Sequence, residues 1–151
     1  MEDGPGELVI ANHIIANEGI VDAFGHISIR DNEDPKRFMI SRSLAPARVT
    51  EGDLQWLDLD RRVVDGDVRP SYAEVAIHAE IYRARPDVMA VCHSHSPSVV
   101  PFSVSQTKLR PIFHMGSLIG GEVPVWDIRA DFGPTDMLVR SSEQAASWIC
   151  G

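Results

Sequence analysis

The sequence predicts an α/β sandwich with a mixed sheet, and three observations support this fold class. Segments with helical spacing of apolar residues alternate along the chain with short segments of strand character. The clearest helical segment, residues 71–86, is followed by the unbroken apolar run Val88 to Cys92, which is typical of a buried strand. The 151 residues contain no internal repeat or interdomain linker, so they fit one domain with its own core.

The N-terminal part of the chain is predicted to contain one helix followed by three strands. Leu8, Ala11 and Ile14 have helical spacing within residues 6–19, and Gly19 suits a helix end. Strand-like segments separated by turns rich in Asp, Pro and Gly follow at residues 26–30, 37–41 and 54–58. Residues 57–67 indicate a strand pair or a strand with a polar return.

The remaining elements follow from the strong helix onward. In residues 71–86, Ser71 is suited to cap the helix and Pro86 lies just past its end. After the apolar strand, a helix is predicted to begin at Pro97. The last predicted elements are strands at 111–115 and 123–128 and a capped helix at 141–150.

Composition and charge exclude several classes of function. The chain is 44% hydrophobic and 24% charged, as in ordinary soluble globular proteins. Its net charge of −8 argues against binding nucleic-acid phosphates, which requires clustered Lys and Arg. No apolar stretch reaches membrane-spanning length, and the acidic N-terminus differs from a signal peptide. Cys92 and Cys150 form no disulfide framework, so we expect a cytoplasmic protein.

Two histidines one residue apart, His93 and His95, follow the apolar run. Residues i and i+2 of a strand point to the same face, so the two imidazoles are predicted to project side by side at a sheet edge. Such a pair suits a divalent metal. For this motif alone, the alternative is two half-exposed polar residues at a strand end.

Other residues suited to chemistry lie on the strong helix and on two loops. Glu74 lies four residues before His78, which fits either a solvated helix pair or a carboxylate acting as acid and base near a metal. The loops supply hydroxyls and arginine forks, which suit a carboxylate or phosphate, or turn formation alone. These loop residues are Gly25, His26, Ser28 and Arg30 in the first loop, and Ser41, Arg42 and Ser43 in the second.

Taken in order, these motifs resemble the class II aldolase/adducin family from about residue 7 to about residue 140. "GHISIR" (25–30) is similar to the family's Gly-Asn-x-Ser-x-Arg. Glu74 and His78, followed by "IYRARPDVMAVCHSHSPS" (81–98), are similar to its Ser-Ser-Glu-x-x-x-His, its apolar strand and its His-x-His. The resemblance implies a three-layer αβα sandwich with a mixed, largely antiparallel central sheet. It also implies that His93 and His95 bind zinc and that Glu74 is the catalytic acid/base.

The chain departs from the phosphate-binding members of this family. Tyr72 and Ala73 stand where those members have paired serines, and Leu44 stands where their second phosphate loop ends in glycine. His26 stands at the family's asparagine. A phosphorylated sugar is therefore not expected. Arg42 offers a bidentate partner for a carboxylate instead, and Tyr72 offers an aromatic wall.

The chain looks most like the decarboxylase branch of the family, through residues 21–30, 41–50, 93–102, 112–116 and 135–140. That branch acts on hydroxylated aromatic carboxylates such as dihydroxyphthalates, and oxygen-using iron enzymes of aromatic natural-product pathways also resemble it. The resemblance implies a metal-dependent carbon–carbon lyase, a homo-oligomer that acts on a small carboxylate. Zinc is the expected metal, with iron, manganese or cobalt as alternatives. The alternative functions are an aldolase acting on a non-phosphorylated substrate, an iron-dependent oxidative enzyme and a non-catalytic adducin-like binding module.

In the lyase hypothesis, Arg42 holds the carboxylate with Ser28 or Ser43, and Glu74 delivers a proton to carbon. The expected substrate site contains Gly25, His26, Ser28, Ser41, Arg42, Ser43 and Tyr72. The family supplies a third histidine ligand from a C-terminal segment, and we expect residues 1–151 to form one domain without that segment. His114 is our candidate third ligand, because it ends a predicted strand as His95 does. His26, Glu74 and a neighbouring subunit are the alternatives.

Overall fold

A four-stranded sheet forms the centre of the computed structural model, which describes residues 4–121 and 123–150. Its strands lie in the order β3-β2-β1-β4, and each described pair is antiparallel. Their bounds are β1 (His26–Arg30), β2 (Arg37–Ser41), β3 (Leu54–Asp58) and β4 (Ala90–His93). The predicted strands at 26–30, 37–41 and 54–58 are thus confirmed. A bridge between Leu57 and Val63 gives the polar return expected after β3.

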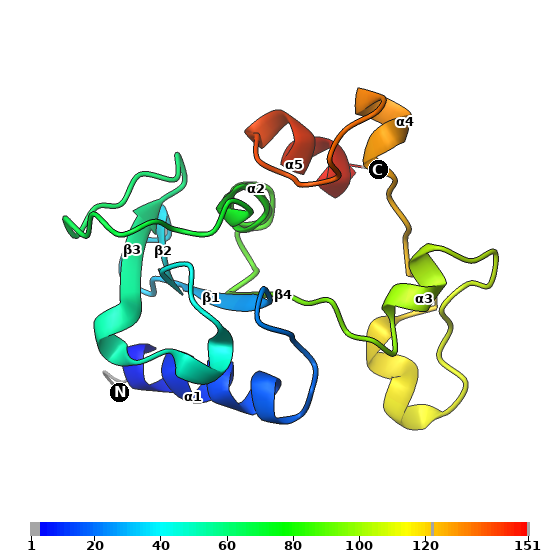
Figure 1. The fold of residues 1–151 in the computed structure, drawn as a ribbon, viewed down its shortest axis with the longest axis horizontal. Helices are drawn as coiled ribbons and strands as arrows, with labels where there is room; N and C mark the ends of the chain where they lie inside the picture. The colour runs from blue at the N-terminus through cyan, green and yellow to red at the C-terminus, as the bar shows by residue number, and fades with distance from the viewer. Residues whose placement is uncertain (1–3, 122, 151) are drawn as a thin grey trace.

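Helices cover both faces of the sheet and give the layered α/β arrangement expected from the sequence (Figure 1). α1 (Gly4–Asn17) lies against one face, and α2 (Val75–Ala84) lies against the other. α5 (Ser142–Cys150) packs on the outer side of α2 beside the short helix α4 (Ile128–Phe132). None of the described helices has both the length and the apolar character needed to cross a bilayer.

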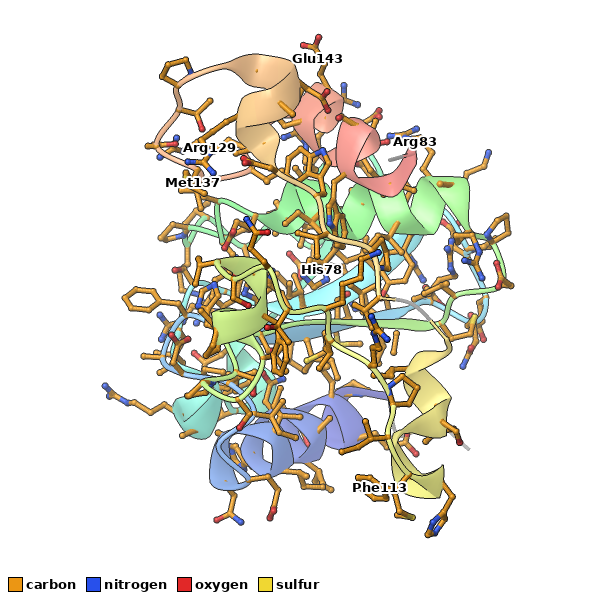
Figure 2. The ribbon with its side chains drawn as sticks, turned by 90° about the vertical axis from the view of Figure 1, so that its right-hand side faces the viewer. His78, Arg83, Phe113, Arg129, Met137 and Glu143 are labelled. Carbon is orange, nitrogen blue, oxygen red and sulfur yellow. The ribbon has the colours of Figure 1, made fainter. Side chains whose placement is uncertain are left out.

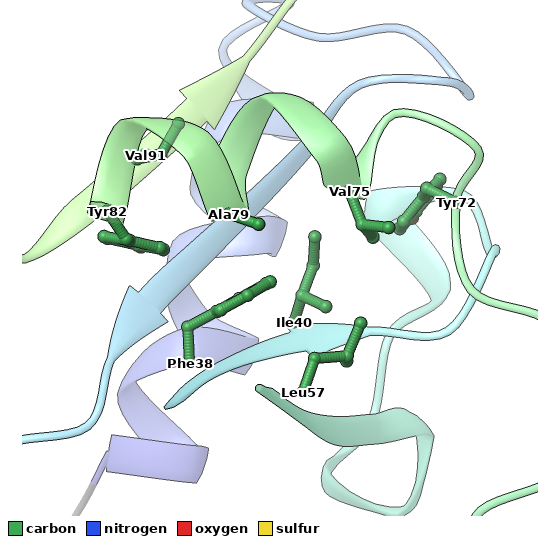
Figure 3. Close-up of a cluster of buried hydrophobic side chains, with 8 residues drawn as sticks. All are labelled: Phe38, Ile40, Leu57, Tyr72, Val75, Ala79, Tyr82 and Val91. Carbon is green, nitrogen blue, oxygen red and sulfur yellow. The ribbon is translucent and has the colours of Figure 1, made fainter. Parts of the chain in front are cut away.

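The main hydrophobic core lies between the sheet and α2 (Figure 3). Phe38 and Ile40 are two residues apart on β2, so both face the helix, and Tyr82 of α2 packs over Phe38 with ring centroids 5.3 Å apart. Ala76 and Ile77 on another face of α2 pack instead against α4 and α5. Burying a side chain such as Phe38 stabilises the fold by roughly 1.5–3 kcal/mol, which fixes α2 relative to the strands.

Arg30, the last residue of β1, connects the sheet to the C-terminal end of α2. Its buried Nη2 donates to the main-chain oxygens of Tyr82 at 2.6 Å and Arg85 at 3.0 Å, where carbonyls at the end of a helix need partners. Nε donates to Val88 O at 2.9 Å, and Nη1 donates to Pro35 O at 2.6 Å. These hydrogen bonds give the Arg30 guanidinium a structural role and not the anion-binding role considered for its loop.

Residues 90–92 of the apolar run belong to the edge strand β4, and the expectation of a fully buried strand over the run is wrong. Val91 is buried, but Ala90 and Cys92 are exposed, because β4 has a described strand on only one side. The strong helix also begins later than expected, at Val75. Ser71 does not cap it, since its hydroxyl donates to Gln55 Oε1 at 2.8 Å.

The two strands predicted at 111–115 and 123–128 are absent from the described chain. α3 (Val100–Ser103) follows β4, and the chain then forms the 3₁₀ helix η3 (His114–Ile119) away from the sheet (Figure 1). Ile112 and Leu118 there are 90% and 95% exposed. Their apolar character suggested strands, but this segment has no sheet neighbour with which to pair. The predicted C-terminal helix is confirmed as α5.

Candidate active site and metal centre

His93 is the last residue of β4 and His95 follows in the loop after it, and the two side chains meet there. Their Nε2 atoms lie 3.0 Å apart. His95 Nδ1 donates to Asp22 Oδ2 at 3.2 Å, which leaves the lone pair of His95 on Nε2, facing His93. Burial lowers the pKa of His93, although the negative charge of Glu74 opposes this shift. The His93 ring is therefore uncharged at neutral pH, which is the form that binds metals.

Two further polar groups complete this cluster. Glu74, at the N-cap of α2, places Oε2 3.6 Å from His93 Nε2. His26 lies directly opposite His93 in the β1–β4 ladder, and the two rings stack with centroids 4.9 Å apart. One ligand atom from each of His26, Glu74 and His93 lies within 4.8 Å of the others. A carboxylate and three imidazoles thus converge at one end of the sheet.

These residues fit a divalent metal. Zinc–nitrogen bonds are about 2.0–2.1 Å long, so two ligands of a tetrahedral zinc lie about 3.3 Å apart. The 3.0 Å between the Nε2 atoms of His93 and His95 is close to this separation. Asp22 holds His95 in the tautomer that binds metals, as carboxylates commonly do for histidine ligands.

His26 is completely buried, and burial lowers its pKa to about 4, with the neighbouring His93 and His95 acting in the same direction. Its Nδ1 donates to Phe24 O at 2.9 Å. Among the described residues, its Nε2 has no hydrogen-bond partner. The ring is therefore neutral at pH 7, with a lone pair on Nε2.

Tyr72, predicted as an aromatic wall, stacks on His26 with ring centroids 4.1 Å apart and an angle of 17° between the planes. Its hydroxyl donates to Leu44 O, accepts from Leu44 N at 3.3 Å, and lies 3.2 Å from Ser41 Oγ. Tyr72 and Ser41 are both buried. The predicted Tyr72 and Ser41 thus lie together, with the tyrosine between the second loop and His26.

Ser28 lies in the layer behind the histidines. Its buried Oγ is 2.7 Å from both His78 Nδ1 and Tyr82 OH. Burial lowers the pKa of His78 well below its usual value, and burial raises the pKa of Tyr82 to about 12. Ser28 thus joins β1 to α2 through its contacts with the buried His78 and Tyr82.

Arg42 and Ser43 lie on the turn after β2, outside the histidine cluster. Arg42 Nε donates to Asp53 Oδ1 at 2.8 Å, and Asp53 also accepts from Thr50. Ser43 is exposed, and its main-chain nitrogen donates to Pro70 O at 2.9 Å. A carboxylate that reaches Arg42 would therefore bind through its Nη groups beside a fixed negative charge.

Gly25 is needed for the close approach of β4 to the turn before β1. A Cβ at this position would lie 2.5 Å from Val21 Cβ and 3.1 Å from His93 O. The same turn is closed by Asp22, whose Oδ1 accepts from the main-chain nitrogens of Phe24 and Gly25. Gly25 thus positions the site through backbone geometry.

The structure corrects the expectation for His114. This residue begins the 3₁₀ helix η3 and not a strand end, and its exposed ring contacts Phe113. Figure 2 shows Phe113 at the periphery of the molecule and His78 near its centre. Within residues 4–121 and 123–150, the cluster of ligand candidates does not include His114. The predicted strand end at His114 is therefore wrong, and His114 lies outside the group formed by His26, Glu74 and His93.

Asp22 is the site residue that sequence reasoning missed. It forms the turn with one carboxylate oxygen and orients His95 with the other. The Asp-x-x-Gly spacing of residues 22–25 indicates a turn, and only this part of its role was open to prediction.

Comparisons with known proteins show the family and the fold to which the chain is similar. A family model described as the class II aldolase and adducin N-terminal domain matches residues 6–146. The decarboxylase tropJ of Talaromyces stipitatus is 34% identical over 139 residues, covering 89% of this chain and 52% of the relative. The 3,4-dihydroxyphthalate decarboxylase of Arthrobacter keyseri is 30% identical, covering 94% of this chain and 59% of the relative.

A similar solved structure is L-fuculose 1-phosphate aldolase from Glaciozyma antarctica PI12. It matches with a TM-score of 0.70 and 27% identity, over 95% of this chain and 55% of that chain. The likeness confirms the predicted fold class. The chain spans between 52% and 59% of the lengths of these three proteins.

Proposed function

Because the chain belongs to the class II aldolase and adducin family, we propose that it is a metal-dependent carbon–carbon lyase that decarboxylates a hydroxylated aromatic or enolisable carboxylic acid. The observation that carries this proposal is the convergence of the His93 and His95 Nε2 atoms beside the Glu74 carboxylate. Two relatives, both named as decarboxylases, support the reaction class.

His93 and His95 would hold the metal, and Asp22 would keep His95 oriented toward it. A bound divalent cation supplies Lewis acidity, which lowers the energy of negative charge on a substrate oxygen. Zinc is the proposed ion because neutral imidazoles are ligands that it accepts, and iron, manganese and cobalt are its competitors.

Glu74 is proposed to supply the proton in the step that this chain performs. The bond between the substrate carbon and its carboxylate carbon breaks, and carbon dioxide leaves. The electron pair stays on the substrate carbon and is delocalised toward the hydroxyl-bearing part of the substrate. The Glu74 carboxylate takes a proton from water and delivers it to that carbon, which leaves hydroxide in solution and returns Glu74 to its starting form. The 3.6 Å between Glu74 Oε2 and His93 Nε2 supports this role, because it puts the acid beside the metal position.

Arg42 is proposed to bind the substrate carboxylate through its Nη groups, since Asp53 occupies its Nε. Arg42→Lys would keep the charge and lose the planar fork, so we expect a raised KM with a smaller change in kcat. An unchanged KM would remove Arg42 from the substrate site.

The decisive experiment measures carbon dioxide release from a panel of hydroxylated aromatic acids by protein with a known metal content. We expect Glu74→Gln to retain the metal and the fold and to lower turnover by roughly a hundredfold or more. Glu143→Gln, which changes an exposed glutamate on α5, is the matched control and should retain full activity. A fully active Glu74→Gln variant, or a native protein that releases no carbon dioxide from any of these acids, would contradict the proposal.

Aldol cleavage of a non-phosphorylated substrate is the second candidate. The likeness to L-fuculose 1-phosphate aldolase favours it, and aldol cleavage also needs an acid beside a carbanionic carbon. Tyr72 and Leu44, which replace the family's phosphate-binding residues, argue against a phosphorylated substrate. Aldehyde release without carbon dioxide would favour this reaction, and consumption of oxygen would favour an oxidative one.

A cytoplasmic location and a homo-oligomeric assembly also belong to this proposal. Elemental analysis of the purified protein identifies the metal, and light scattering gives the mass of the assembly in solution. Cell fractionation tests the location.

A further inference from the structure

We propose that His26 is a further metal ligand, through Nε2, so that the metal is held by β1 as well as by the end of β4. This inference rests on the proposed function, because it concerns the same metal as His93 and His95. His26 stands where the family's Gly-Asn-x-Ser-x-Arg motif has asparagine, and the proposed metal ligation gives it a different role from that asparagine.

The first reason is the state of the His26 ring. A main-chain carbonyl can only accept a hydrogen bond, so the 2.9 Å contact with Phe24 O places the proton on Nδ1. Nε2 then carries a lone pair, although the ring is completely buried and Nε2 has no partner in the described chain. A buried polar atom without a partner destabilises the fold, and a metal ion bound to Nε2 would remove that cost.

The second reason is the position of the ring. The antiparallel register pairs His26 with His93, so both side chains leave the sheet on the same face. Their rings stack with 18° between the planes, and Tyr72 holds the His26 ring by stacking at 4.1 Å. Ligand atoms of His26, Glu74 and His93 all lie within 4.8 Å of one another. Two ligands of one zinc ion lie about 3.3 Å apart, so binding of one ion by both rings requires the His26 and His93 rings to turn out of their stacked arrangement until their lone pairs converge.

His78 offers a useful contrast within the same region. Its Nε2 is also buried and without a partner among the described residues. Its Nδ1, however, lies 2.7 Å from Ser28 Oγ, and His78 is not part of the group formed by His26, Glu74 and His93. A buried ring nitrogen without a hydrogen-bond partner is therefore not enough to identify a metal ligand. The assignment to His26 depends on the additional convergence with His93.

The direct test uses the native chain and needs no substitution. Imidazole nitrogen resonances of the ¹⁵N-labelled protein are recorded while Zn²⁺ is added to metal-free protein. We expect the Nε2 signals of His26, His93 and His95 to shift together at one equivalent of Zn²⁺, and the His114 signals to stay unchanged. If the signals of His93 and His95 shift and that of His26 Nε2 does not, this inference is wrong and the proposed metal site stands. If none of the three shifts, both proposals fail.

A second test compares Zn²⁺ affinity by chelator competition, and the visible spectrum of the Co²⁺-substituted protein, across matched variants. His26→Asn, which introduces the family's residue, should weaken Zn²⁺ binding by roughly tenfold or more and change the Co²⁺ spectrum. His114→Asn should change neither quantity. His26→Gln serves as a second variant if near-ultraviolet circular dichroism shows that His26→Asn is not folded. A folded His26 variant with the native affinity and the native Co²⁺ spectrum would overturn the assignment.

Discussion

Replacing His26 should make the metal-free protein less sensitive to acid. The pKa of a free histidine is near 6.5, and burial lowers that of His26 to about 4. The unfolded chain therefore takes up a proton at His26 before the folded chain does. The free energy of unfolding is therefore unaffected by the protonation of His26 above pH 6.5, and it falls as the pH decreases from 6.5 toward 4.

The size of the effect follows from the two pKa values. A tenfold change in a protonation constant corresponds to about 1.4 kcal/mol, so lowering the pKa from 6.5 to about 4 gives a total loss of about 3 kcal/mol. Between pH 6.5 and pH 4, the free energy of unfolding falls by up to about 1.4 kcal/mol for each pH unit. At pH 5 the loss already reaches about 2 kcal/mol, which is a large part of the stability of a domain of this size.

Urea unfolding of the metal-free protein at pH 7, 6 and 5, with a chelator present, measures this dependence. We expect His26→Asn to reduce the loss of free energy of unfolding between pH 7 and pH 5 by about 2 kcal/mol. His78 stays buried in this variant, so part of the acid sensitivity remains. His114→Asn, which changes an exposed histidine, should keep the full native dependence. If His26→Asn keeps it too, the reasoning from burial is refuted.

Three further predictions concern the parts that position the site. Arg30→Met leaves four carbonyl oxygens without their donor and should lower the free energy of unfolding by at least about 3 kcal/mol in urea titrations; a loss below about 1 kcal/mol would contradict its structural role. Gly25→Ala places a methyl group 2.5 Å from the nearest side-chain carbon and should weaken Zn²⁺ binding measured by calorimetry, whereas Gly52→Ala, with its nearest neighbour at 3.9 Å, should not. Tyr82→Phe removes the hydroxyl beside Ser28 and should cost about 1 kcal/mol in thermal unfolding, without loss of the metal.

Local patterns predicted the first three strands because each is a short apolar segment between turn residues. The side chains of His93 and His95 do meet, but β4 ends at His93, so the two-residue repeat of a strand does not account for the position of His95. Reasoning from local patterns failed at 111–115 and 123–128, where the apolar residues are equally suggestive. Whether such a run becomes a strand depends on a neighbouring strand, and local sequence does not encode one.

The position of His26 shows the same limit within the site. Its motif identifies it as a loop residue near the substrate, but its proximity to His93 comes from the register between β1 and β4. Glu74 was predicted inside a helix and lies at its N-cap, from which it reaches His93. Contacts between distant segments depend on how the strands and helices assemble, and single-sequence periodicity describes each segment alone.

Because Arg30 binds the C-terminal end of α2, the distance between His26 and Glu74 depends on the length of β1 matching the length of α2. From His26 to Arg30, β1 spans four residue steps, or about 13 Å at about 3.3 Å per residue. From Glu74, the N-cap of α2, to Tyr82 within α2 there are eight steps, or about 12 Å at about 1.5 Å per residue. Arg30 joins the two elements at one end, and the histidine–carboxylate cluster joins them at the other. One residue inserted into α2 would turn Glu74 by about 100° around the helix axis, so this pair of elements should tolerate substitutions far better than insertions or deletions.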